Sequence, residues 1–119
     1  MSTQLPYIIE KFDQAAYLLA TGEGAARSRV GAAYRCFWHI PLEDFPETIH
    51  GDRREITTML TRLGGRQGYV IPENLRRMKN STAAEIARLI LSIRIRVLEA
   101  RTREAAQPPG LPQPSGPPA

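Results

Sequence analysis

The fold is decided by residues 82–105, which read TAAEIARLILSIRIRVLEARTREA. Within this stretch, the run from Ser92 to Val97 alternates apolar and polar residues, as a β-strand would. Strong helix formers lie on both sides of that run, from Ala83 to Arg88 and from Leu98 to Ala106. Helix propensity summed over such a window outweighs a short alternation, so the sequence predicts one long α-helix.

Two apolar stripes follow this helix when each residue advances it by about 100°. The first stripe is the predicted core face and consists of Ile86, Leu89, Ile90, Ile93, Val97 and Ala100. The second stripe lies about 130° away and consists of Ala87, Leu91, Ile95 and Leu98. A helix with two apolar stripes lies either at the centre of its own bundle or against another chain. Both alternatives stay open from the sequence alone.

The second stripe is the candidate partner-binding surface. Arginines beside it would provide a charged rim, which protein interfaces often have. We therefore expect contact with another polypeptide, either a different protein or a second copy of this chain. The predicted partner-binding residues are Leu91, Ile95, Leu98, Arg88, Arg94 and Arg101.

The rest of the chain predicts an all-α bundle of four to five helices over residues 1–105. Apolar residues at helical spacing indicate helices at about 5–20, 25–39 and 53–63, with Leu63 buried, and a short helix from Pro72. D-x-x-E and T-x-x-E patterns predict capping boxes at Asp52 and Thr82. Residues 69–71 are a candidate extended piece. Residues 106–119 hold six of the ten prolines and predict a disordered tail.

Composition places the chain among small globular proteins. Its 119 residues, 42% hydrophobic, suit one domain. No apolar run approaches the roughly 20 residues of a membrane span, and residues 1–14 do not resemble a secretory signal. The only cysteine, Cys36, suits a reducing compartment. We therefore expect a cytoplasmic protein without a membrane contact.

Positive charge is concentrated in the second half of the chain. Residues 1–52 carry four basic and seven acidic groups, whereas residues 53–104 carry twelve basic and five acidic groups. Arginines that clamp phosphates, together with an aromatic ring for stacking, are typical of single-stranded nucleic-acid binding. An alternative function is therefore nucleic-acid binding through residues 62–79. The residues concerned are Arg62, Arg66, Tyr69, Arg76, Arg77 and Lys79.

Catalytic and metal-binding patterns are weak. Cys36 and His39 lie one helical turn apart and His50 follows, but no third orienting group is evident for a nucleophile, and three ligands are few for a metal site. A cysteine beside Phe37 and Trp38 is more often a small buried hydrophobe. The sequence predicts no catalytic residue, no metal and no cofactor.

Four short segments carry a general resemblance to known proteins. They are residues 19–24 (LATGEG), 26–30 (ARSRV), 41–46 (PLEDFP) and 60–62 (LTR). Together they resemble small helical proteins of bacterial accessory genomes and mobile elements that lack an assigned activity. The resemblance spans most of residues 7–100 and implies a bacterial setting in which small proteins often act as regulators, antitoxins or inhibitors. It carries over no binding or catalytic residue. We accordingly predict a non-enzymatic binding protein of that kind.

Overall fold

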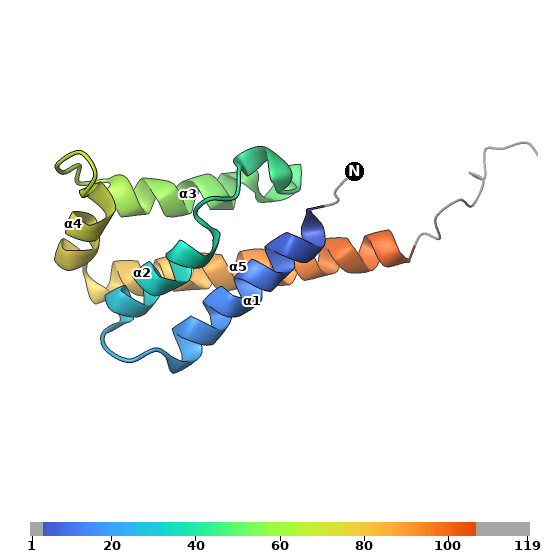
Figure 1. Ribbon diagram of the computed structural model, residues 1–119, viewed down its shortest axis with the longest axis horizontal. Helices are drawn as coiled ribbons and strands as arrows, with labels where there is room; N and C mark the ends of the chain where they lie inside the picture. Colours follow the sequence, from blue (N-terminus) through green and yellow to red (C-terminus); the bar gives the residue numbers. More distant parts are fainter. Residues whose placement is uncertain (1–3, 107–119) are drawn as a thin grey trace, which may run out of the picture.

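The computed structural model describes residues 4–106, and there the chain is entirely helical apart from its connections (Figure 1). This confirms the predicted all-α bundle. The predicted tail lies outside the described residues except for Ala106. The elements are α1 (Leu5–Thr21), α2 (Ala26–Phe37), the 3-10 helices η1 (Leu42–Asp44) and η2 (Glu47–Ile49), α3 (His50–Thr61), α4 (Val70–Arg77) and α5 (Asn80–Ala105).

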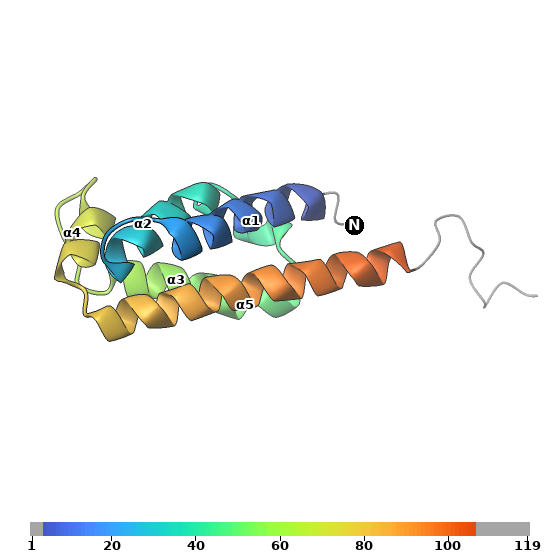
Figure 2. The ribbon, with the colours of Figure 1, turned by 90° about the horizontal axis from the view of Figure 1, so that it is seen from below.

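Helix α5 is the axis of the bundle. It runs antiparallel to α1, and α2 and α3 also pack against it (Figure 2). Helix α4 contacts α2 and α3 and lies at the end of the molecule where α5 begins (Figure 1). The last turns of α5 project beyond the other helices in both views.

Four of the six residues of the predicted core face of α5 are buried, and the other two, Leu89 and Ala100, are half-buried against the core. Ile86, Ile90, Ile93 and Val97 are fully inaccessible to solvent. Opposite this face, Phe12 of α1 stacks on an α2 ring, Phe37, with the ring centroids 4.3 Å apart. These apolar contacts join α1, α2 and α5 in one core, and their burial is the main stabilising contribution to the fold.

Both predicted capping boxes are wrong, because each helix begins three residues earlier than predicted. Helix α3 starts at His50, since the η2 turn runs directly into it, and α5 starts at Asn80 after an extended Lys79. Neither helix has a side-chain cap hydrogen bond. Asp52 instead accepts a hydrogen bond from Arg96 of α5, with Arg96 Nη1 2.5 Å from Asp52 Oδ2. Asp52 therefore links α3 to α5.

The segment between α3 and α4 also differs from the prediction. Helix α3 ends at Thr61, so Leu63 lies beyond it and is exposed. The expected extended piece at 69–71 is wrong for residues 70 and 71, which open α4. Pro72 lies in the first turn of that helix, where a missing N–H removes no intrahelical bond.

Buried Asn74 fixes this segment to α4. Its Oδ1 accepts a hydrogen bond from the Leu63 N–H at 2.9 Å. Its Nδ2 donates to the carbonyl oxygens of Gly64 at 3.0 Å and Val70 at 2.8 Å. One side chain therefore makes hydrogen bonds to three backbone groups around the start of α4.

Within residues 4–106, no helix combines the length and the apolar composition that crossing a membrane requires.

Candidate partner-binding and nucleic-acid surfaces

The second stripe of α5 lies on the side away from the bundle. Leu91 and Ile95 are 40% and 53% exposed, and Leu98 is half-buried. Only Ala87, at the start of the stripe, packs against the core. Of the two alternatives that the sequence leaves open, burial of the whole stripe within its own bundle therefore does not occur. We call Leu91, Ile95 and Leu98 the outer stripe.

The three arginines predicted to flank the outer stripe differ in their partners. Arg94 is held by α1, because its Nε donates to Asp13 Oδ1 at 2.7 Å. Arg88 and Arg101 are exposed, and no carboxylate of residues 4–106 lies within ion-pair distance of either. These two side chains are therefore available to an acidic partner.

Helix α1 adds an aromatic residue that the sequence did not single out. Because α1 and α5 are antiparallel, one turn past Asp13 on α1 corresponds to one turn before Arg94 on α5. This register brings Tyr17, which is 66% exposed, to the level of Leu91. Tyr17 lies off the core stripe of α1, so only the pairing of the two helices relates it to the outer stripe.

The basic segment does not form one continuous surface. Arg62, Arg77 and Lys79 line a hollow of about 230 Å³ between α3, α4 and the start of α5. Arg76 instead faces α2, on the other side of α4. The structure therefore brings three of the five predicted cations together and separates Arg76 from them.

Arg66 and Tyr69 lie in the loop before α4 and contact each other. The Arg66 guanidinium is 4.9 Å from the centre of the Tyr69 ring. Arg66 Nε also donates to Glu73 Oε2 at 3.1 Å. Tyr69 remains 54% exposed, so part of its ring is open for stacking while Arg66 covers another part.

Charge is separated along the molecule. The cations of the basic segment gather around α4, at the C-terminal end of α3. Glu43, Asp44 and Glu47 lie in η1 and η2, next to the N-terminal end of α3 (Figure 1). The 12 residues of α3 hold these two groups roughly 18 Å apart.

The residues considered for thiol or metal chemistry have other partners. Burial raises the pKa of the Cys36 thiol, and the nearby positive charges of Lys11 and Arg35 oppose this effect only in part. His39 Nε2 lies 2.7 Å from the Tyr7 hydroxyl oxygen, and His50 Nε2 donates to the Phe45 carbonyl oxygen at 2.9 Å. Among the described residues, no three His, Cys, Asp or Glu side chains gather as a metal site.

Arg53 of α3 is a buried cation that the sequence did not reveal. Its guanidinium lies 5.1–5.8 Å from the centres of the Tyr34, Phe37 and Phe45 rings. Its Nη1 donates to Thr57 Oγ1 at 3.0 Å, whereas its buried Nε has no partner. The three aromatic faces compensate part of the charge, so Arg53 ties α3 to α2 and to the turn that follows η1.

Comparison of the chain with protein-family models, with curated proteins and with solved structures finds no match.

Proposed function

We propose that this protein is a non-enzymatic binding protein that contacts another polypeptide through the outer stripe of α5. The exposure of Leu91 and Ile95 carries this proposal. Their helix already buries Ile86, Ile90, Ile93 and Val97 on its core face, so these side chains are not needed there. Covering them with a partner would contribute about 25 cal/mol for each Å² of apolar surface removed from water.

The surroundings of the outer stripe specify the chemistry of the partner. The stripe is straight and about two turns long, which suits the apolar face of another helix. Arg88 and Arg101 favour acidic residues beside that apolar face, because complementary charges orient and accelerate association. The proposed partner is therefore an amphipathic helix with acidic flanks. A regulator, antitoxin or inhibitor in the bacterial cytoplasm would mask its target through such a contact.

The state of Cys36 supports binding rather than thiol catalysis. A reactive cysteine needs a lowered pKa, which an adjacent base or positive charge provides. Here burial raises the pKa, and the Cys36 thiol donates instead to the Ala32 carbonyl oxygen, 3.7 Å away. The histidine one turn on, His39, lies beside Tyr7.

Ile95→Asp tests the proposal, with Gln14→Asp on the exposed face of α1 as the matched control. Both variants add one negative charge at an exposed helical position, so both should fold as wild type does. We expect wild type and Gln14→Asp to retain the same polypeptide from an extract of the native host, and Ile95→Asp to lose it. Retention by all three proteins would contradict the proposal.

Sedimentation velocity distinguishes a second copy of the chain from a different protein. If the occupant is a second copy, wild type dimerises as its concentration rises, and Ile95→Asp remains a monomer. If wild type stays a monomer, the partner is a different protein. A dimer that Ile95→Asp leaves intact would place the contact elsewhere and exclude self-association through the outer stripe.

Nucleic-acid binding is the second candidate function, and one observation favours it. Arg62, Arg77 and Lys79 line one hollow, and none of the residues that line it is acidic. Phosphate contacts release counterions, so binding should weaken steeply as salt rises. Arg77→Gln should flatten that salt dependence in a gel-shift titration. Absence of any shift with DNA or RNA at low salt would exclude this candidate.

A further inference from the structure

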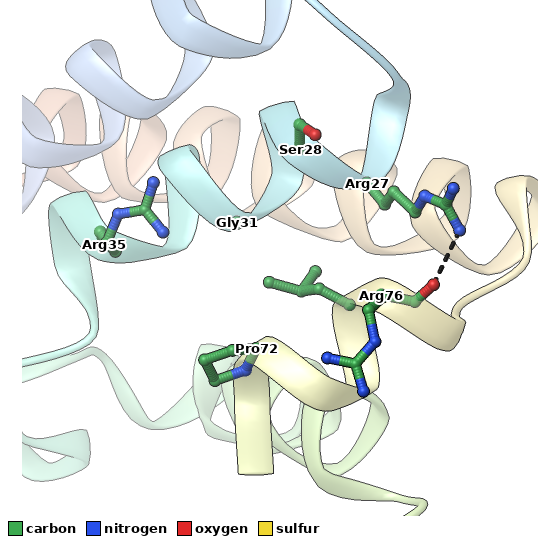
Figure 3. Close-up of a pocket in the computed structure, with 7 residues that line it drawn as sticks. Arg27, Ser28, Gly31, Arg35, Pro72 and Arg76 are labelled. Atoms are coloured by element: carbon green, nitrogen blue, oxygen red, sulfur yellow. Dashed lines mark hydrogen bonds between the residues drawn. The ribbon is translucent and has the colours of Figure 1, made fainter. Parts of the chain in front are cut away.

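A pocket of about 400 Å³ lies between α2 and α4 (Figure 3). It is separate from the outer stripe and, across α4, from the hollow that holds Arg77. Three of its side chains are arginines, and none is acidic. The pocket is lined by Arg27, Ser28, Gly31, Arg35, Pro72, Leu75 and Arg76.

The sequence of α2 explains why a pocket forms here. Arg27, Gly31 and Arg35 follow one another at intervals of four residues, so they lie along one face of the helix. Glycine lowers helix stability relative to alanine. At position 31, however, a Cβ would lie only 2.8 Å from Leu75 Cδ1. Gly31 thus makes room for the Leu75 side chain of α4, and the two arginines of α2 lie on either side of Gly31 (Figure 3).

The arginines of this pocket are not neutralised by the protein. Arg27 Nη1 donates to the carbonyl oxygens of Arg76 at 2.9 Å and Met78 at 3.3 Å, which fixes its guanidinium at the end of α4. The side chains of Arg35 and Arg76 form no ion pair within the described part of the chain. Three like charges on one pocket repel one another, and a bound anion would relieve that repulsion.

We propose that the pocket between α2 and α4 binds the phosphate groups of a ligand. Guanidinium groups match phosphate oxygens with paired, charge-assisted hydrogen bonds. Arg35 and Arg76 would donate to the ligand, while Arg27, held on the carbonyl oxygens of α4, adds positive charge that favours a group with more than one negative charge. Pro72 and Leu75 provide an apolar wall. The volume lies in the range of small-molecule sites.

Phosphate of this kind has two sources, a free nucleotide or a nucleic-acid strand, and two probes distinguish them. Calorimetry with ADP measures binding of the free nucleotide. Fluorescence anisotropy of a short labelled single-stranded oligonucleotide measures binding of a strand. The variants are Arg35→Gln and Arg76→Gln, which remove charge at similar length. Arg27 is left unchanged because it also supports α4. The control is Arg54→Gln, an exposed arginine of α3 outside the pocket.

We expect at least one probe to bind at low salt, and each pocket variant to weaken that binding by about tenfold or more. Arg54→Gln should bind as wild type does, and circular dichroism should show all variants folded. Binding of ADP identifies a free nucleotide, whereas binding of the oligonucleotide alone identifies a strand. The proposal is overturned if neither probe binds, or if all three variants weaken binding equally. The pocket does not depend on the contact proposed for α5, so each proposal can fail alone.

Discussion

Helices α5 and α4 are held in the bundle by different kinds of contact. Helix α5 buries a continuous row of apolar side chains, and α1, α2 and α3 all pack on it. In the shorter α4, Ile71 and Leu75 are only half-buried against the core, and polar side chains that reach backbone atoms add to the attachment. Asn74 holds the preceding loop, and Arg27 of α2 holds the last carbonyl oxygens. The many apolar contacts of α5 are non-directional and tolerate small shifts. The few hydrogen bonds of α4 are directional, so the loss of any one of them should have a large effect on the local stability of α4.

The largest expected change in stability distinguishes the core face of α5 from its outer stripe. Ile93 is fully buried and Ile95 is half exposed. Ile93→Asp would bury an unpaired carboxylate, so we expect a loss of about 4 kcal/mol or more in the free energy of unfolding. Ile95→Asp should lose less than about 1 kcal/mol. Urea titrations followed by circular dichroism measure both. Equal losses would show that the outer stripe is part of the core.

The second effect concerns the polar attachment of α4. Asn74→Ala removes the side chain that hydrogen-bonds to the Leu63 N–H and to the carbonyl oxygens of Gly64 and Val70, and we expect a loss of about 2 kcal/mol. Arg77→Ala, at an exposed position of the same helix, is the control and should change stability by less than about 0.5 kcal/mol. Hydrogen exchange in Asn74→Ala should accelerate in residues 62–77 and remain slow in the core of α5. Uniform acceleration would mean that α4 is not an independent unit.

A smaller effect is expected at the other end of α4. Arg27→Gln removes the guanidinium that donates to the carbonyl oxygens of Arg76 and Met78. Because both sites are partly open to water, we expect a loss of about 1 kcal/mol. Faster exchange should be confined to the last turn of α4 and the start of α5. No change in exchange there would show that water replaces Arg27 without cost.

The smallest expected effect concerns the reactivity of Cys36, which contributes neither to the apolar row of α5 nor to the polar contacts of α4. The pKa of its thiol is raised by burial, so the thiolate fraction at pH 8 is lower than in the unfolded chain. Iodoacetamide should therefore react more slowly with the native protein than with the protein in urea. Stability should also fall slightly as the pH rises above the pKa of the unfolded thiol. A native rate above the unfolded rate would indicate an activated thiol.

The same contrast explains what the sequence could predict. Apolar periodicity predicted most of the buried face of α5, and the helix propensity of the flanking residues predicted its helical state through the alternating run 92–97. The same periodicity wrongly placed Leu63 in the buried face of α3. The helix ends before Leu63, and Asn74 holds the following loop by hydrogen bonds that the spacing of apolar residues does not reveal. Asp52 and Thr82 were misassigned because their patterns mark plausible helix starts. The actual starts follow from the η2 turn and from extended Lys79.

The candidate sites show the same limit. Spacing alone identified the outer stripe, but its exposure depends on which side of α5 the other helices occupy. The spacing of Arg27, Gly31 and Arg35 was also visible in the sequence. That these residues line a pocket could not be predicted from the spacing, because Arg76 and Leu75 of α4 complete the pocket from a distant part of the chain.

The separation of charge along α3 gives the molecule a permanent electric dipole. A negatively charged surface exerts a torque on such a body before any contact forms, and the end that carries α4 turns toward it. This alignment acts over about one Debye length, roughly 8 Å at physiological ionic strength. On a cation-exchange resin, the protein should therefore attach by the α4 end and leave the projecting last turns of α5 facing the solvent.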